Sequence, residues 1–325
     1  MIKNKSILIT GGTGSLGKKL TDIIIKKYKP KRLVIFSRDE LKQYEMEQIY
    51  LKEKYPCIRY FLGDIRDRDR LIKAFRNIDY VIHCAALKQV PAAEYNPFEF
   101  IKTNVLGAQN IIDAALECGV KKVIALSTDK AANPINLYGA TKLCSDKLFL
   151  AANNYAAVNC TFSVVRYGNV FGSRGSVIPL FREQVKKGEI TLTDERMTRF
   201  WITLEEAANF VLDCLDRMEG GELFVPKIAS MRVVDLIKAI APKLKIKVIG
   251  IRPGEKLHEM LISKDDSRYT REYSDRFEII YPSLYHNINS KKNNGKKISE
   301  DSEYTSDKNS KWLSIEEMRK LLKMI

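Results

Sequence analysis

The sequence predicts an α/β fold: a Rossmann-type doubly wound parallel sheet with a smaller mixed α/β substrate lobe. Three observations predict it. Short apolar runs, typical of buried parallel strands, alternate with helical stretches from residue 6 to about residue 168. The first of these runs leads directly into a glycine-rich loop and a helical stretch. With 325 residues and 45% hydrophobic content, the chain can bury a large core and carry an appended lobe.

The first predicted strand runs from Lys5 to Thr10, and a loop of sequence GGTGSLG follows it at residues 11–17. Strand, glycine loop and helix together bind the pyrophosphate of a dinucleotide. The glycines permit a tight turn and a close approach of backbone amides, and the phosphate charge lies at the helix N-terminus. We therefore expect cofactor contacts from Gly11, Thr13, Gly14, Ser15, Leu16 and Gly17.

The second predicted strand, Arg32 to Phe36, ends where a dinucleotide-binding fold meets the ribose of its cofactor. Ser37, Arg38 and Lys42 follow, and a hydroxyl with two cations suits a 2′-phosphate. The sequence thus favours NADP, while Asp39 leaves NAD possible.

The next two predicted strands supply the remaining cofactor contacts. Ile58 to Leu62 precedes Asp64 and Ile65, which we expect beside the adenine. Tyr80 to His83 precedes Ala85 and Ala86, where small side chains would let the backbone pass close to the cofactor.

The fifth predicted strand, Lys122 to Leu126, ends just before Thr128, Asp129 and Lys130. Open α/β sheets bind ligands at the carboxyl ends of their strands, so we expect these three side chains in the active site. Tyr138 and Lys142 stand four apart at the start of a helical stretch and should share one face. An ammonium beside a phenol favours the phenolate, which can take the proton of a substrate alcohol while the cofactor removes hydride.

We divide the chain into a cofactor-binding domain over residues 1–170 and, mainly, a substrate lobe over residues 171–325. A sixth strand, Thr161 to Val165, closes the first part, and a helix is expected from Val177 to Lys187. Residues 287–311 are rich in Asn, Ser, Lys and Asp and predict a solvated polar loop. A terminal helix from Ile315 to Leu322 is expected to dock back.

Composition narrows the function class. The formal charge of +15 is spread without an aromatic platform or a nucleic-acid-reading motif, so we expect no nucleic acid partner. No signal peptide or apolar run of about 20 residues is present, and we expect a cytoplasmic protein without membrane contact. The six Cys and three His lack metal-ligand spacing, and we expect reduced thiols and no metal site. We also expect a homo-oligomer.

Several runs carry a family resemblance: residues 7–17, 37–42, 85–88, 93–97, 127–147, 164–179, 197–201 and 251–259. Nearly end to end, the chain resembles the extended short-chain dehydrogenases/reductases, and within them the inverting UDP-N-acetylglucosamine 4,6-dehydratases that begin pseudaminic acid synthesis. Retaining and capsular-sugar relatives typically carry Met at the position of Tyr138, so the tyrosine favours the inverting group.

The resemblance implies a mechanism. Tyr138, assisted by Lys142, would take the O4 proton while NADP accepts hydride from C4, and Thr128 would hold O4. Neutral Lys130 would remove the C5 proton, protonated Asp129 would help the C6 hydroxyl to leave, and Lys130 would then reprotonate C5 on the opposite face. The comparable glucose dehydratases have Glu at the position of Lys130, so this departure bears on the configuration at C5.

The resemblance also implies contacts with the nucleotide sugar. These are expected from Lys88, Asn169, Arg174, Arg199, Arg252 and Glu255. We expect Glu94 and His258 to be structural and Lys256 to be solvated. Two alternatives stay open: a nucleotide-sugar 4-epimerase or reductase, which usually lacks Asp129 and Lys130, and a non-catalytic NADP-binding regulator, which would commonly lose Tyr138 or Lys142.

Overall fold

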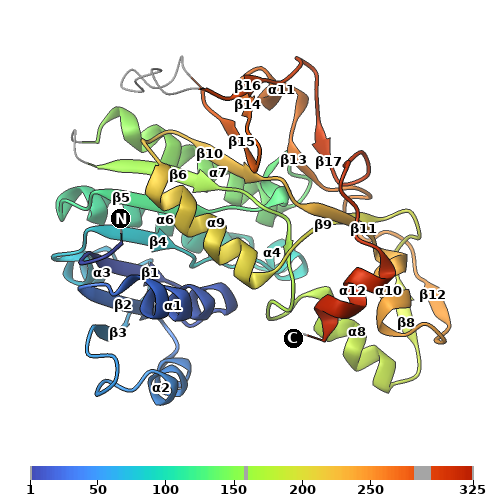
Figure 1. The fold of residues 1–325 in the computed structure, drawn as a ribbon, viewed down its shortest axis with the longest axis horizontal. Helices are drawn as coiled ribbons and strands as arrows, with labels where there is room; N and C mark the ends of the chain where they lie inside the picture. Colours follow the sequence, from blue (N-terminus) through green and yellow to red (C-terminus); the bar gives the residue numbers. More distant parts are fainter. Residues whose placement is uncertain (1, 157–159, 282–293, 324–325) are drawn as a thin grey trace.

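The structure is a computed structural model that describes residues 2–156, 160–281 and 294–323. Its centre is one sheet of ten strands in the order β16-β14-β15-β10-β6-β5-β4-β1-β2-β3 (Figure 1). The strands from β3 to β10 run parallel, and β15, β14 and β16 follow antiparallel at the far edge. The order 3-2-1-4-5-6 places the switch point between β1 and β4, where open α/β sheets bind their ligands.

The first six strands of the sheet match the apolar runs of the sequence, because strands covered on both faces are predominantly apolar. Their bounds are β1 Ser6–Thr10, β2 Arg32–Ser37, β3 Ile58–Leu62, β4 Tyr80–His83, β5 Lys122–Leu126, β6 Thr161–Val165, β10 Leu223–Pro226, β14 Thr270–Glu272, β15 Arg276–Ile279 and β16 Lys296–Lys297. The predicted positions of the first six strands are confirmed. The chain returns to this sheet after residue 170, since β10, β14, β15 and β16 extend it.

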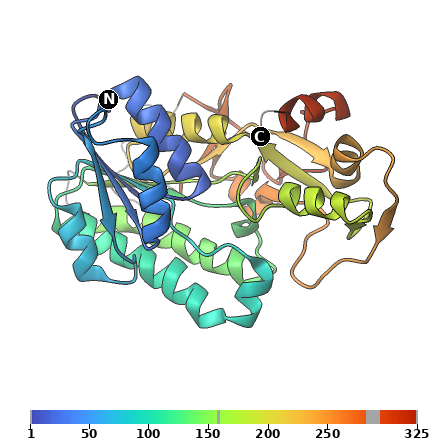
Figure 2. The ribbon, with the colours of Figure 1, turned by 90° about the horizontal axis from the view of Figure 1, so that it is seen from below.

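Helices cover both faces of the sheet. One face carries α1 and α9, which pack on each other, and the other carries α3, α6 and α7 (Figures 1 and 2). The helices of this part are α1 Ser15–Tyr28, α2 Glu40–Ile49, α3 Arg68–Phe75, α4 Val90–Tyr95, α5 Pro97–Phe100, α6 Gly107–Glu117, α7 Leu137–Ala151 and α9 Leu204–Arg217, with short turns η1 Ile101–Leu106, η2 Asp129–Ala131 and η3 Ala152–Asn154.

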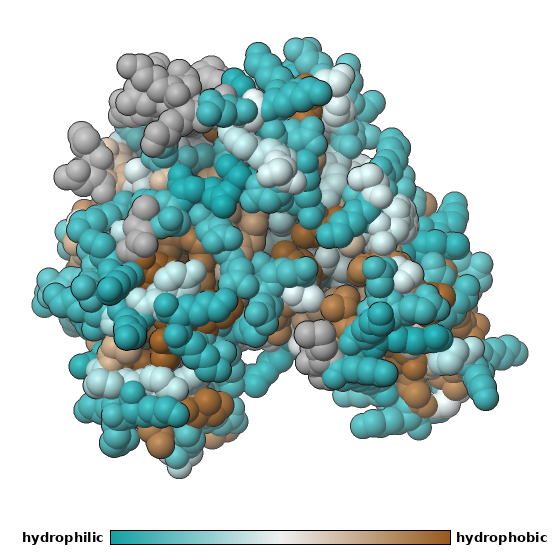
Figure 3. Space-filling model, in the orientation of Figure 1, coloured by the Kyte–Doolittle hydropathy of each residue, from teal (hydrophilic) through white to brown (hydrophobic). Residues whose placement is uncertain are grey.

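The smaller lobe holds three short sheets, β7-β9-β11, β8-β12 and β13-β17, and a second hydrophobic core. Its elements are β7 Asn169–Val170, α8 Val177–Lys186, β8 Ile190–Leu192, β9 Thr198–Ile202, β11 Ala229–Arg232, α10 Val233–Ile240, β12 Ile246–Val248, β13 Met260–Ile262, α11 Lys264–Ser267, β17 Tyr304–Thr305 and α12 Ile315–Leu322. The predicted terminal helix is confirmed, and it packs on α10. Figure 3 shows a cleft between this lobe and the part that carries α1.

The predicted polar loop is corrected in its second half. Residues 287–293 lie outside the described residues, but residues 294–311 contain β16 and β17. Ser306 and Asn309 are buried there, and Asn309 donates to the Ile228 carbonyl and the Ser230 hydroxyl. The polar composition predicts exposure to solvent, whereas Asn309 instead hydrogen-bonds to buried backbone carbonyls.

Neither a membrane-spanning helix nor a metal-binding cluster occurs in the described parts of the chain. No helix there combines enough length and apolar character to cross a membrane. No group of three or more His, Cys, Asp or Glu side chains there can hold a metal ion.

Candidate active site

The glycine loop joins β1 to α1 as expected, and its first glycine is essential to its shape. Gly11 has φ +64°, a conformation that side chains rarely adopt, and a Cβ there would lie 2.8 Å from the Ala85 backbone nitrogen. The start of α1 has no side-chain cap and no acidic residue in its first turn. Its first amides are therefore available to a phosphate group.

At the end of β2 the predicted ribose contacts lie together, but Asp39 is already engaged. Its carboxylate caps α2 by accepting from the Lys42 amide at 3.0 Å, and it also contacts the Lys42 ammonium. Arg38 lies 3.5 Å from Asp64, and the positive charge of Arg174 acts on Asp39. The buried Ser37 hydroxyl accepts from Gln43. This corner therefore holds several cations, and the Asp39 carboxylate has a structural role as the cap of α2.

The segment after β4 is held by a residue that sequence reasoning missed. Asn104, buried in the π-helical turn η1, donates to the Leu87 carbonyl at 2.9 Å and accepts from the Leu87 amide at 2.9 Å. It also donates to the Thr141 hydroxyl on α7. Asn104 thus fixes Ala85 and Ala86 near Gly11 and ties this segment to the helix of Tyr138. An irregular helical turn has no clear sequence signal.

Thr128, Asp129 and Lys130 form a turn at the carboxyl end of β5, as expected. Thr128 is its N-cap, and the Thr128 hydroxyl donates to Asp129 Oδ1 at 2.9 Å. The turn packs so closely against α7 that a Cβ on Gly139 would lie 2.2 Å from the Lys130 carbonyl oxygen. Glycine at 139 therefore allows the catalytic residues of the turn and helix to meet.

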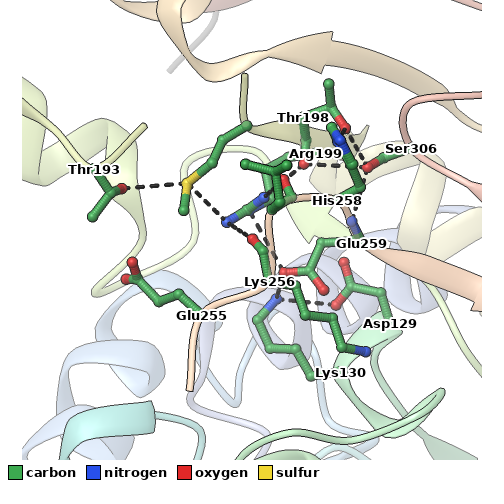
Figure 4. Close-up of polar contacts among 12 residues, drawn as sticks. Asp129, Lys130, Thr193, Thr198, Arg199, Glu255, Lys256, His258, Glu259 and Ser306 are labelled. Atoms are coloured by element: carbon green, nitrogen blue, oxygen red, sulfur yellow. Dashed lines mark hydrogen bonds and ion pairs between the residues drawn. The ribbon is translucent and has the colours of Figure 1, made fainter. Parts of the chain in front are cut away.

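Lys130 lies between two buried carboxylates. Its Nζ is 3.1 Å from Asp129 Oδ1 and 3.3 Å from Glu259 Oε1 (Figure 4). Burial opposes the charge, but the two carboxylates raise the pKa of Lys130 above its ordinary value. The two carboxylates therefore favour the protonated form of Lys130, and its role as the base at C5 stays a prediction.

The two carboxylates differ in their surroundings. Burial raises the pKa of Asp129, and the Glu259 charge adds to this against the opposing effect of Lys130. Burial acts the same way on Glu259, but Lys130, Arg199 and Lys256 together hold its pKa below the ordinary value. Asp129 is therefore the carboxylate that can carry a proton.

Tyr138 and Lys142 lie on α7, which Asn136 caps by accepting from the Gly139 amide. Both side chains are buried, and burial has the largest effect on the pKa of each. It raises the pKa of Tyr138 to about 12, against the lowering effects of Lys130 and the Thr128 hydroxyl, and it lowers the pKa of Lys142. Desolvation is the largest influence on both pKa values, and the assistance of Lys142 to Tyr138 stays a prediction.

A loop from the smaller lobe, residues 252–259, packs over the turn of Thr128, Asp129 and Lys130. We call this turn the catalytic turn, after its predicted role. Lys256 Nζ donates to the Ala132 carbonyl at 2.5 Å, and Asn136 donates to the Gly254 carbonyl at 2.8 Å. Lys256 is thus a contact of the turn and not the solvated side chain that was expected. His258 is structural as expected, with Nδ1 2.9 Å from the Thr198 hydroxyl.

The expected substrate contacts lie around this loop and the cleft. Arg252 and Glu255 pair at 2.6 Å, whereas Arg199 donates to the carbonyls of residues 198, 256 and 257 and pairs with Glu259. Arg199 therefore supports the loop. The Arg174 amide donates to the Ser15 hydroxyl, so this residue borders the cofactor loop. Burial lowers the pKa of Lys88, and the nearby positive charge of Lys130 lowers it further. Asn169 lies in β7. As substrate contacts, all six stay predictions.

The family described as "Polysaccharide biosynthesis protein" matches residues 7–281. The chain belongs to this family. It is an extended short-chain dehydrogenase/reductase. Over 332 aligned residues it is 54% identical to an inverting UDP-N-acetylglucosamine 4,6-dehydratase of Campylobacter jejuni, covering 99% of this chain and 98% of that protein. A Rickettsia canadensis UDP-glucose 4-epimerase is 40% identical, over 99% of this chain and 96% of that protein.

Solved structures agree on the fold of this family member. The X-ray structure of Pen from Bacillus thuringiensis is 40% identical, with TM-score 0.90, over 100% of this chain and 99% of that chain. A Streptomyces venezuelae dTDP-glucose 4,6-dehydratase, solved as a double mutant with NAD and DAU bound, shares the fold at 21% identity and TM-score 0.67, over 77% and 86% of the two chains.

Proposed function

We propose that this chain is an inverting UDP-N-acetylglucosamine 4,6-dehydratase that uses NADP. The observation that carries the proposal is the buried turn of Thr128, Asp129 and Lys130 against Tyr138 and Lys142, in a chain 54% identical over its length to a dehydratase of that name. An acid, a base and a redox pair are the groups that loss of water from C5 and C6 requires. The expected product is UDP-2-acetamido-2,6-dideoxy-β-L-arabino-4-hexulose.

The reaction begins at C4. Tyr138 takes the proton of O4, and the Thr128 hydroxyl holds that oxygen in line. A nicotinamide cofactor held by the glycine loop would supply the redox chemistry, which is uptake of hydride from C4 and its return to C6. Lys142, buried on the same face of α7, supplies the positive charge that favours the phenolate. Oxidation at C4 makes the C5 proton acidic.

Elimination needs a base at C5 and an acid at the C6 hydroxyl, and the Lys130–Asp129 pair can supply both. The two groups share a hydrogen bond of 3.1 Å. Passing one proton from the Lys130 ammonium to Asp129 leaves a neutral amine and a protonated carboxyl, with no change in total charge. The amine then takes the C5 proton, and the carboxyl gives its proton to the departing hydroxyl. The resulting Lys130 ammonium reprotonates C5 on the other face.

Support for NADP comes from the corner at the end of β2. Both Asp39 oxygens are engaged by Lys42, so this acid is poorly placed to accept hydrogen bonds from a free ribose. Arg38, Lys42 and Arg174 supply positive charge there, which suits a 2′-phosphate. The cytoplasmic location and the homo-oligomer stay predictions.

The test is incubation with UDP-N-acetylglucosamine in heavy water, followed by NMR of the product. A 4-keto-6-deoxy sugar of arabino configuration, with deuterium at C5 and no net use of cofactor, is the expected result. Formation of UDP-N-acetylgalactosamine alone would make the chain an epimerase. A 4-keto product that retains its C5 configuration would refute inversion and keep the dehydratase.

A further inference from the structure

Glu259 extends from the smaller lobe to the catalytic turn. Its carboxylate and that of Asp129 lie at similar distances from Lys130 Nζ. Its Oε1 lies 3.3 Å from Lys130 Nζ, and its carboxylate is 3% exposed. No motif in the sequence analysis gave it a role. Its position next to the ammonium needs an explanation, because a second buried carboxylate at one lysine is costly unless further cations balance it.

The backbone of Glu259 is fixed on both sides. Its amide donates to the Ser306 hydroxyl at 2.9 Å, and its carbonyl accepts from the Ser306 amide at 2.8 Å. Ser306 is itself buried and lies 2.6 Å from the Thr198 hydroxyl. The carboxylate is therefore held in place by the lobe and does not drift with the catalytic turn.

Arg199 distinguishes Glu259 from Asp129, whereas the charge of Lys256 acts on both carboxylates. Arg199 Nε lies 3.6 Å from Glu259 Oε1, and Lys256 is the third positive charge that acts on this carboxylate (Figure 4). In the described structure the Asp129 carboxylate contacts Lys130 and the Thr128 hydroxyl through Oδ1, and neither Asp129 Oδ2 nor Glu259 Oε2 has a hydrogen-bond partner. The three cations keep Glu259 ionised, and its negative charge in turn makes Asp129 a better proton acceptor.

We infer that Glu259 is a positioning residue for elimination: as the fixed anion of the cluster, it anchors Lys130 Nζ and directs the mobile proton to Asp129. This inference rests on the proposed dehydratase function. If the two carboxylates were equivalent, the proton of Lys130 would divide between them, and a protonated Glu259 would be of no use at C6. The unequal distribution of cations removes this ambiguity.

Glu259→Gln removes the charge and keeps the shape. Oxidation at C4 uses Tyr138 and Lys142 and should proceed, while elimination slows by on the order of 10-fold or more. In a single turnover the near-ultraviolet absorbance of the reduced nicotinamide should therefore rise and persist. Without the Glu259 charge the pKa of Asp129 falls, so its protonated form is lost at lower pH. The alkaline limb of the elimination rate should move to lower pH.

Two further variants serve as controls, one that retains the charge at position 259 and one that changes a buried carboxylate elsewhere. Glu259→Asp retains the charge and should return the alkaline limb toward that of the parent. Glu278→Gln is the matched control, because Glu278 is also a buried carboxylate paired with an arginine, Arg276 at 2.7 Å, but lies in β15 away from the site. It should leave both steps and the pH profile unchanged. If Glu259→Gln does not fold, Lys256→Met, which removes one cation from Glu259, should slow elimination selectively.

The outcomes distinguish failure of the proposed dehydratase function from failure of the proposed role of Glu259. A parent protein that forms no 4-keto-6-deoxy product overturns the proposed function. A parent that forms it, with a Glu259→Gln variant whose oxidation and elimination slow equally or whose alkaline limb does not move, overturns the role of Glu259. With Lys256→Met as the only folded variant, an unchanged elimination rate would do the same.

Discussion

Tyr138 and Lys142 are both almost entirely removed from water on one face of α7. Their spacing of four was sufficient to predict that shared face, and the structure confirms it. Their pKa values were not predictable from the spacing, because desolvation by the surrounding lobe dominates both. At the scale of single residues, sequence therefore identifies candidate groups and the face they share, while burial has the largest influence on their pKa values.

Tyr138→Phe should slow oxidation at C4 by about 10²-fold or more, because it removes the phenol that is proposed to take the O4 proton. In the parent protein burial raises the pKa of Tyr138 to about 12. The phenolate fraction therefore grows as pH rises from neutrality, and so should the single-turnover rate of oxidation. Stopped-flow absorbance of reduced nicotinamide measures both. A rate independent of pH over the neutral and mildly alkaline range would contradict Tyr138 as the base.

Arg38→Ala should weaken NADP binding by about 1.5 to 3 kcal/mol, the range for a hydrogen bond to a charged group, and change NAD binding much less. Calorimetric titration of cofactor-stripped protein with each nucleotide measures the difference. Arg70→Ala is a nearby arginine control, since Arg70 donates to the Leu62 carbonyl. Equal losses for NADP and NAD in the Arg38 variant would mean that this arginine does not contact the 2′-phosphate.

The close contact between the catalytic turn, η2, and helix α7 depends on Gly139 in the helix. Sequence reasoning placed both elements, because an apolar strand and a capped helix are local patterns. It gave Gly139 no part, because a close approach between two elements is visible only when both are in place. The same holds for Asn104, whose partners on Leu87 and Thr141 lie in separate segments.

Gly139→Ala tests that approach. Alanine favours a helix by about 1 kcal/mol over glycine, but here its Cβ would collide with the Lys130 carbonyl, 2.2 Å away. We expect the turn to shift and elimination to fall by about 10²-fold, as small misplacements in active sites cost. Cofactor binding should be retained. Ala140→Gly, the reverse change one residue on, should lower stability slightly and leave elimination near the parent rate. Parent-like elimination in Gly139→Ala would show that the turn tolerates the shift.

Across the whole molecule, buried charges connect the sheet to the smaller lobe. Arg166, just after β6, lies 3.5 Å from Asp146 on α7 and 3.4 Å from Asp266 of α11, and donates to the Leu261 carbonyl. The sheet and its strand bounds were predictable from local apolar runs. The contacts of Arg166 with Asp266, of Lys130 with Glu259 and of Lys256 with Ala132 were not, because each joins residues 100 or more positions apart.

Arg166→Met should cost about 3 to 5 kcal/mol of unfolding free energy, because it leaves Asp146 buried without its charge partner. Arg217→Met is the matched control. Arg217 pairs with Asp275 at a more exposed site, 3.3 Å away, and its loss should cost about 1 kcal/mol or less. Urea unfolding of both variants gives the comparison. Equal costs would mean that Arg166 is no more important to the lobe junction than a surface pair.

The contacts that hold the catalytic turn in place come from residues 254–259, which follow the turn by more than 100 positions in the sequence. A ribosome releases the amino end first, and earlier parts of a chain begin to fold before later parts emerge. Strands β1 to β6, all within the first 165 residues, are thus synthesised well before Lys256 and Glu259. During its own synthesis the protein therefore acquires the glycine loop and the turn of Asp129 and Lys130 first, and the residues that hold this turn in place last.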